Sequence, residues 1–169
     1  MIKCIVFSIV STFCILIRVN NMLKYNFKNI EKNDCDLIFE WANDETVRNN
    51  SFNSNTIEYE EHVKWFDEKL KSTDSIMHIF EVNNVSVGLI RLDRFDDKSF
   101  LINYSIAKEH RGRGYATYLL QLIKDKYKTN FLIGKVKSTN SASIKAFMKA
   151  GYIMKDESDI KLFYSFDRD

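Results

Sequence analysis

The sequence has no proline, only five glycines and three cysteines, and these shortages limit what the chain can be. The cysteines, Cys4, Cys14 and Cys35, are odd in number and lack the close spacing of metal ligands, so we expect neither a disulfide framework nor a metal site. The formal net charge is only +2 and the basic residues form no dense run, which argues against nucleic acid as the main partner. Asn, Lys and Ile are abundant, so the missing prolines fit a bias towards A- and T-rich codons and say little about loops.

Residues 4–17 are almost wholly apolar, between Lys3 and Arg18. This run is shorter than the roughly 20 residues that a membrane-spanning helix needs. It resembles the apolar part of a signal peptide, but no convincing cleavage site follows. We favour Met22 as the true start, with residues 1–21 a spurious extension; the alternative is a weak membrane anchor. We therefore expect a single domain over residues 22–169 in the cytoplasm, with membrane contact only if residues 1–21 are translated.

Hydrophobic periodicity predicts a mixed α/β order along the rest of the chain. Helices are expected from a cap at Asp34 through Trp41, from about Ile57 through Leu70, and over residues 115–126 and 141–150, the last ending at Gly151. Asn83-Asn84 predicts a tight hairpin, and a polar loop with Arg48 is expected after Trp41. Strands are expected over residues 23–30, 76–82, 85–92, 100–107, 131–136 and 160–166.

The segment Arg111-Gly112-Arg113-Gly114-Tyr115-Ala116 lies between a predicted strand and a predicted helix. Two glycines let the main chain take positive φ and approach a ligand closely. The first turn of the helix offers unpaired N–H groups and the positive end of a dipole, and the two arginines add charge. The segment therefore predicts a pyrophosphate cradle, the alternative being a tight turn with solvated arginines. It matches neither a P-loop nor a dinucleotide fingerprint.

A second motif runs from Asn140, where a strand passes into a helix, to Tyr152. By itself Asn140 reads as a helix cap. Together, Arg111-x-x-Gly114-x-Ala116 and the set Asn140, Ser143, Lys149, Gly151 and Tyr152 resemble the motifs of the GCN5-related N-acetyltransferase (GNAT) superfamily. The resemblance covers essentially all of residues 22–169.

The resemblance implies a mostly antiparallel sheet of six to seven strands, with about four helices and a V-shaped opening between the parallel strands 100–107 and 131–136. Acetyl-CoA would lie in that opening as co-substrate. Its pyrophosphate would meet the cradle and its pantetheine arm would pair with the main chain near Tyr104. The residues implied to contact it are Tyr104, Ser105, Ile106, Arg111, Gly112, Arg113, Gly114, Tyr115, Ala116, Thr117, Asn140, Ser143 and Phe147.

One position departs from the family pattern. Many members have a tyrosine where Phe147 stands, and that tyrosine protonates the leaving thiolate. Phenylalanine cannot do so, and we expect an amine to attack the thioester directly, with the thiolate protonated by another group or by water. For a general base the candidates are His78, Tyr104 and His62, each of which could equally be a core residue.

The acceptor is predicted from the pattern Asn-Asp-x-x-Val-Arg-x-x-Ser-Phe over residues 43–52, followed by Ile57, His62, Trp65 and Phe66. It looks like the acetyltransferases that act on UDP-4-amino-4,6-dideoxy sugars in pseudaminic acid and related pathways. Arg48 would bind the diphosphate, or else pair with Asp44 or Glu45, and Trp41, Phe52 or Trp65 could stack on uracil or be core. The implied acceptor residues are Arg48, Asn49, Ser51, Phe52, His62 and Trp65. One alternative is a protein N-terminal acetyltransferase, which would share Ile102, Tyr104 and Ile106. Another is a non-catalytic acyl-CoA-binding module. A homodimer is compatible with any of these functions.

Overall fold

The computed structural model describes residues 23–166, which form a seven-stranded sheet in the order β1-β2-β3-β4-β5-β7-β6. One pair, β4 with β5, is parallel, and every other neighbouring pair is antiparallel. The predicted extension over residues 1–21 lies outside the described residues. The strands are β1 (Tyr25–Asn29), β2 (Ser75–Val82), β3 (Val85–Arg94), β4 (Ser99–Ile106), β5 (Phe131–Lys137), β6 (Ile153–Glu157) and β7 (Ile160–Tyr164).

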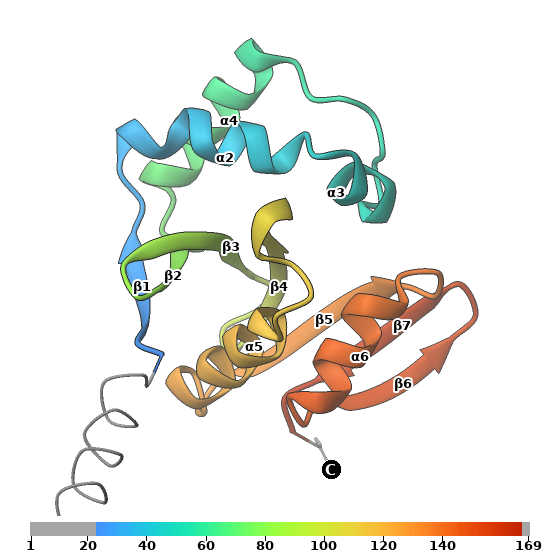
Figure 1. Cartoon of the computed structure of the whole chain (residues 1–169). Helices are drawn as coiled ribbons and strands as arrows, with labels where there is room; N and C mark the ends of the chain where they lie inside the picture. The colour runs from blue at the N-terminus through green and yellow to red at the C-terminus, as the bar shows by residue number, and fades with distance from the viewer. Residues whose placement is uncertain (1–22, 167–169) are drawn as a thin grey trace, which may run out of the picture.

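Helices cover both faces of the sheet (Figure 1). The helix α5 (Tyr115–Lys126) and the helix α6 (Ser141–Lys149) pack on one face, where Leu119, Leu120 and Ile123 are fully buried against the strands. On the other face, α2 (Cys35–Ala42) and α4 (Tyr59–Lys71) bury Ile38 and Phe66 against Met77 of β2. The short helix α3 (Glu45–Asn50) and two 3-10 turns, η1 (Lys32–Asp34) and η2 (Lys108–His110), complete the described helices.

The predicted fold class is confirmed, and every predicted strand and helix is present in the predicted sequence, as are both tight turns. Asn83 and Asn84 have φ of 53° and 63° and join Val82 to Val85, as a two-residue hairpin requires. Gly151 has φ of 75° directly after the C-cap of α6. Both turns could be predicted because they depend on local backbone geometry alone.

Three details of the prediction are wrong. The polar loop expected around Arg48 contains α3, because Asp44 caps a short helix by accepting a hydrogen bond from Val47 N–H. The helix expected from about Ile57 begins at Tyr59. The edge strand β6 was not predicted; all five of its residues are exposed, so it lacks the alternating apolar pattern that marks a half-buried strand. Within residues 23–166, no helix is long and apolar enough to cross a membrane.

Candidate functional site

The parallel strands β4 and β5 separate before either of them ends. Their pairing runs from Ser99↔Phe131 to Ile102↔Gly134, whereas β4 continues to Ile106 and β5 to Lys137. On its other side, β4 stays paired with β3 as far as Ile106. The main chain of residues 103–106 thus faces a gap on the β5 side. We call this the splayed gap; an extended ligand can pair there with β4 as an added strand would.

Phe147 closes the gap at the point where the strands part. A Cβ atom on Gly134 would lie 2.5 Å from Cζ of Phe147, so only glycine fits beneath the ring. The ring is 2% exposed and stacks on Phe163 with ring centroids 4.7 Å apart. Phe147 is therefore part of the core.

The cradle lies at the other end of the gap, between η2 and α5. Gly112 and Gly114 have φ of 75° and 81°, and Gly114 is the N-cap of α5 in the left-handed conformation. Within the described part of the chain, the N–H groups of residues 112–116 donate to no backbone carbonyl. They lie at the positive end of a 12-residue helix, so the segment has both the donors and the field that a pyrophosphate needs.

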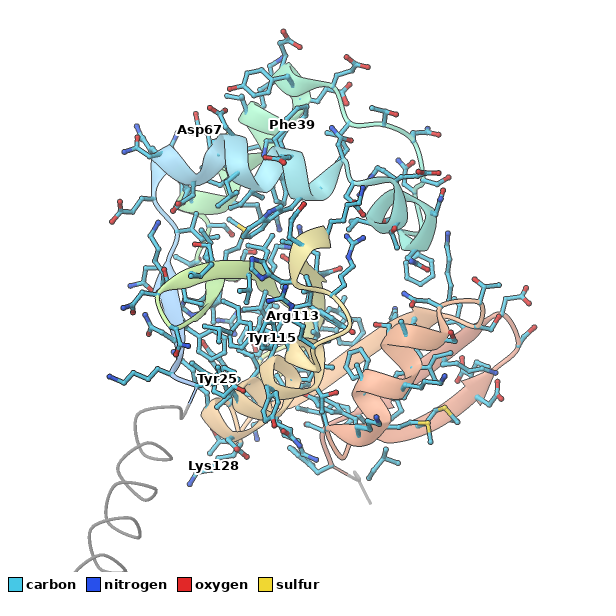
Figure 2. All side chains as sticks on the ribbon, viewed as in Figure 1. Tyr25, Phe39, Asp67, Arg113, Tyr115 and Lys128 are labelled. Atoms are coloured by element: carbon cyan, nitrogen blue, oxygen red, sulfur yellow. The ribbon has the colours of Figure 1, made fainter. Side chains whose placement is uncertain are left out.

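The two arginines of this segment have different surroundings. Arg113 is exposed and donates to Glu109 O over 3.0 Å; Figure 2 labels it beside Tyr115 at the beginning of α5. Arg111 is half-buried and points away from the helix end: its Nη2 lies 2.6 Å from Asp44 Oδ1, and its Nε donates to Ile106 O over 2.9 Å. Of the two side chains, only that of Arg113 is free to turn towards an anion on α5.

A pair of hydroxyl groups bridges the splayed gap. Tyr104 Oη, from β4, lies 2.6 Å from Ser143 Oγ, from the first turn of α6. Asn140 caps this helix by accepting a hydrogen bond from Ser143 N–H, so its side chain holds Ser143 in place. Burial raises the pKa of Tyr104 to about 12 even though the hydrogen bond to Ser143 acts in the opposite direction. Tyr104 is thus protonated at neutral pH.

The remaining residues implied for acetyl-CoA line the same region. Ser105 is half-buried and Ile106 is buried at the end of β4, and Tyr115, Ala116 and Thr117 are half-buried in the first turn of α5. The predicted acetyl-CoA residues therefore come from the second half of β4, the turn that follows it, the first turn of α5, and α6 with its N-cap.

On the acceptor side, the polar groups of the predicted motif are bonded to one another. Asn43 makes two hydrogen bonds of 2.9 Å with the backbone of Ile57. Arg48 donates to Ala42 O, Asn53 O, Asn55 O and Ser51 Oγ over 2.6 to 3.3 Å, and burial lowers its pKa. It pairs with neither Asp44 nor Glu45, and four of its five N–H donors are already used. We call residues 43–57 the acceptor loop; Arg48 is its internal brace.

The other predicted acceptor residues are divided between two places. Asn49, Ser51 and Phe52 belong to the acceptor loop, where Phe52 is 59% exposed and Asn49 O accepts from Lys137 Nζ over 3.1 Å. His62 is buried in the α2–α4 layer, with Nε2 3.2 Å from Cys35 O, and burial lowers its pKa. Trp65 lies next to it, with the guanidinium of Arg91 5.2 Å from its ring centre.

Neither of the two candidate histidines, His62 and His78, lies at the splayed gap. His62 packs among Phe39, Trp65 and Phe66. His78 is buried on β2 against Phe27, and burial and Lys126, at the far end of α5 from the cradle, lower its pKa. Of the three predicted candidates for acid–base chemistry, Tyr104 alone lies in the gap.

Sequence reasoning missed two contacts. Asp44 and Arg111 are 67 residues apart, and no local pattern links them. Asp93 accepts hydrogen bonds from Lys69, Arg91, Ser75 and Asn103, which come from three strands and one helix. Apart from Arg91, which lies on the same strand as Asp93, the partners come from separate elements that only the tertiary fold brings together.

Comparison with known proteins supports the geometry. A family model described as an acetyltransferase (GNAT) domain matches residues 25–153. The structure resembles the spermidine N-acetyltransferase of Vibrio cholerae in complex with CoA and spermine, with 16% identity, a TM-score of 0.75, and coverage of 83% of this chain and 94% of that one.

Two further structures share the fold. The aminoglycoside acetyltransferase AAC(6')-Ib in complex with coenzyme A and kanamycin has 12% identity, a TM-score of 0.70, and coverage of 83% of this chain and 93% of that one. A domain from Methanocaldococcus jannaschii has 17% identity, a TM-score of 0.69, and coverage of 85% and 98%. No curated protein matched the sequence. With its splayed parallel strands, its glycine cradle and a family match over most of its length, the chain belongs to the GNAT acetyltransferases and uses acetyl-CoA as its co-substrate.

Proposed function

We propose that this chain acetylates a primary amine on a small molecule by direct transfer from acetyl-CoA. The observation that carries the proposal is the splayed gap, which leads from the free N–H groups of the cradle to the Tyr104–Ser143 pair. The pyrophosphate of acetyl-CoA would be held by the N–H groups of residues 112–116, and its pantetheine arm would pair with the main chain of residues 104–106. The amine would approach from the acceptor loop.

The chemical step needs orientation and a proton for the leaving thiolate. The amine nitrogen attacks the thioester carbonyl, an N–C bond forms and the C–S bond breaks; the nitrogen then loses one proton and the leaving thiolate gains one. Holding the reactants in line can supply several kcal/mol of the barrier. We assign the proton donor to Tyr104, because Phe147 has none and the Tyr104 hydroxyl is protonated and lies beside the Phe147 ring, with ring centroids 5.9 Å apart. Ser143 orients that hydroxyl.

For the acceptor, the motif over residues 43–52 supports the 4-amino group of a UDP-4-amino-4,6-dideoxy sugar. The motif supports this acceptor through the shape of the loop. Its residues hold the acceptor loop in place through hydrogen bonds to the backbone of the loop and of Ala42, just before it. Lys137 supplies positive charge on this side of the sheet, whereas the charge of Arg91 is paired with that of Asp93.

Charge favours a second acceptor class, a polyamine or another polycation. Residues 31–71 contain eleven acidic and five basic residues, whereas residues 108–161 contain five acidic and twelve basic ones. The α2–α4 layer is therefore negative and would attract a cation, while the half that holds the cradle is positive and suits a nucleotide. The fold neighbours with bound spermine and kanamycin have cationic acceptors of this kind.

One assay separates these acceptors. The full chain is incubated with acetyl-CoA and, in turn, a UDP-4-amino-4,6-dideoxy sugar, spermidine, and peptides with free N-termini, and thiol release is measured at low and high ionic strength. We expect turnover with a small-molecule amine. A cationic acceptor attracted by the acidic layer should lose kcat/KM as salt rises, whereas a sugar nucleotide should not. Turnover with peptides alone, or acetyl-CoA binding with no turnover on any amine, would refute the proposal.

A further inference from the structure

The cradle and the acceptor loop meet at one ion pair, Asp44 with Arg111, whose atoms Oδ1 and Nη2 lie 2.6 Å apart. From this contact we propose that Asp44 and Arg111 are positioning residues that hold the acceptor loop in register with the phosphate cradle. The inference rests on the proposed function, since it assigns a task to residues between the two substrates.

Arg111 is tied to the cofactor side. It is the first residue of the cradle segment, and its Nε donates to the carbonyl of Ile106, the last residue of β4. The guanidinium thus braces the turn between the end of the strand and the helix that follows. With Nε and Nη2 both engaged, its plane is fixed, which a lysine could not reproduce.

Asp44 is tied to the acceptor side. The oxygen that meets Arg111 also accepts the N–H of Val47 and caps α3. The preceding residue, Asn43, holds Ile57 at the far end of the acceptor loop. Burial acts to raise the pKa of Asp44, but the hydrogen bonds from Arg111 and from backbone N–H groups outweigh it and lower the pKa, so the carboxylate is ionised at neutral pH.

The position of this pair gives it an effect on rate. Direct attack requires the amine and the thioester carbonyl to be held in line, and a misplacement of about 1 Å can cost roughly 100-fold. The amine side is positioned by the acceptor loop and the thioester side by the cradle. A contact that joins the two loops therefore acts on the distance between the reactants more than on the affinity for either one.

The test uses the full chain with D44N, R111Q, R111K, R113Q and the double variant D44N/R111Q. We expect D44N and R111Q to lower kcat at least tenfold at a temperature far below Tm, while the Kd for acetyl-CoA changes less than about threefold. The double variant should be no slower than the worse single one, because both remove the same contact. R111K should recover part of the rate, since it restores the charge without the hydrogen bond to Ile106. D74N is the matched control: the Asp74–Arg94 pair is 3.0 Å long but more exposed, and kcat should not change.

Two outcomes would overturn the proposal. If Tm falls in D44N and R111Q while kcat and both KM values stay unchanged, the pair only stabilises the fold. If R111Q weakens acetyl-CoA binding as much as R113Q does and D44N has no effect, Arg111 is a phosphate ligand. Amide hydrogen exchange over residues 43–57 keeps the test separate from the proposed function. Should the wild type turn over no amine, faster exchange there in D44N and R111Q still supports the positioning role, and unchanged exchange refutes it.

Discussion

The two sides of the site are built in opposite ways. On the cofactor side, glycines leave backbone N–H groups free, and the segment is defined by what it does not bond to. On the acceptor side, almost every polar group of the motif is bonded within the loop, with Arg48 alone making four hydrogen bonds. The two motifs are equally conspicuous in the sequence, but their residues have different tasks in the structure. The cofactor motif leaves hydrogen-bond donors open to a ligand, whereas the acceptor motif holds a loop in place.

This contrast explains why the co-substrate can be identified with more detail than the acceptor. A pyrophosphate is bound by main-chain N–H groups whose placement depends on glycine, so a local sequence pattern can predict such a site. An amine acceptor meets the surface of a braced loop, where side chains such as the 59% exposed Phe52 make no contact within the described residues that fixes their identity.

The largest effect on acetyl-CoA binding should come from Gly114→Val, which changes the cradle. A β-branched residue is strongly disfavoured at φ of 81°, so the cradle must change shape. We expect the Kd for acetyl-CoA to rise at least tenfold, measured by calorimetry. Gly151→Val is the control, since φ is 75° there but the residue follows α6. Equal effects of the two variants on acetyl-CoA binding would contradict the cradle assignment.

The largest effect on kcat should come from Tyr104→Phe in the splayed gap. Loss of a general acid costs about 100-fold or more, so kcat should fall by that order with little change in KM. Ser143→Ala should have a smaller effect of the same kind, since Ser143 only orients the hydroxyl. In Tyr152→Phe, which removes a buried hydroxyl bonded to Leu120 O, kcat should hold. If Tyr104→Phe turns over at the wild-type rate, Tyr104 is not the proton donor and water protonates the thiolate.

A smaller effect is expected from Arg48→Ala on the acceptor side. Removing the brace leaves carbonyl groups of the loop without their donor, and the free energy of unfolding should drop by about 2 kcal/mol in urea titrations. KM should rise for every acceptor alike, because the loop loses its shape. A rise confined to UDP-sugar acceptors would instead show direct contact of Arg48 with the diphosphate, and the contrast between the two sides would then be wrong.

The smallest effect should come from Asp93→Asn, and it should depend on pH. Burial acts to raise the pKa of Asp93, but hydrogen bonds from Lys69 and Ser75 and the charge of Arg91 lower it. A carboxylate with a lowered pKa contributes stability above the ordinary value of about 3.9 and loses it as the pH falls through the folded-state pKa. The variant should therefore be less stable than the wild type by about 1 kcal/mol near neutral pH, and the gap should close below pH 4. A gap that stays constant down to pH 3 would rule out the ionised carboxylate as the cause.

How much of the site could be predicted depended on the range of the signal. The cradle, the cap at Asn140 and the end of α6 at Gly151 are local, since each follows from a few consecutive residues. The histidines show the reverse case. His62 and His78 are plausible acid–base groups by residue type, but the fold buries each one in a layer away from the gap.

The sequence by itself determined six of the seven strands, the four longer helices, the tight turns and the position of the glycine segment before α5, because periodicity and glycine conformation act within a few residues. The tertiary structure alone decided which of the conspicuous side chains are free. It turned Arg48 and Arg111 inward, set Phe147 over Gly134, and brought Tyr104 to Ser143 across the gap. The physical reason is that a polar group in a folded chain bonds to whatever lies nearest in space, and in this molecule those neighbours are up to 88 residues away along the sequence.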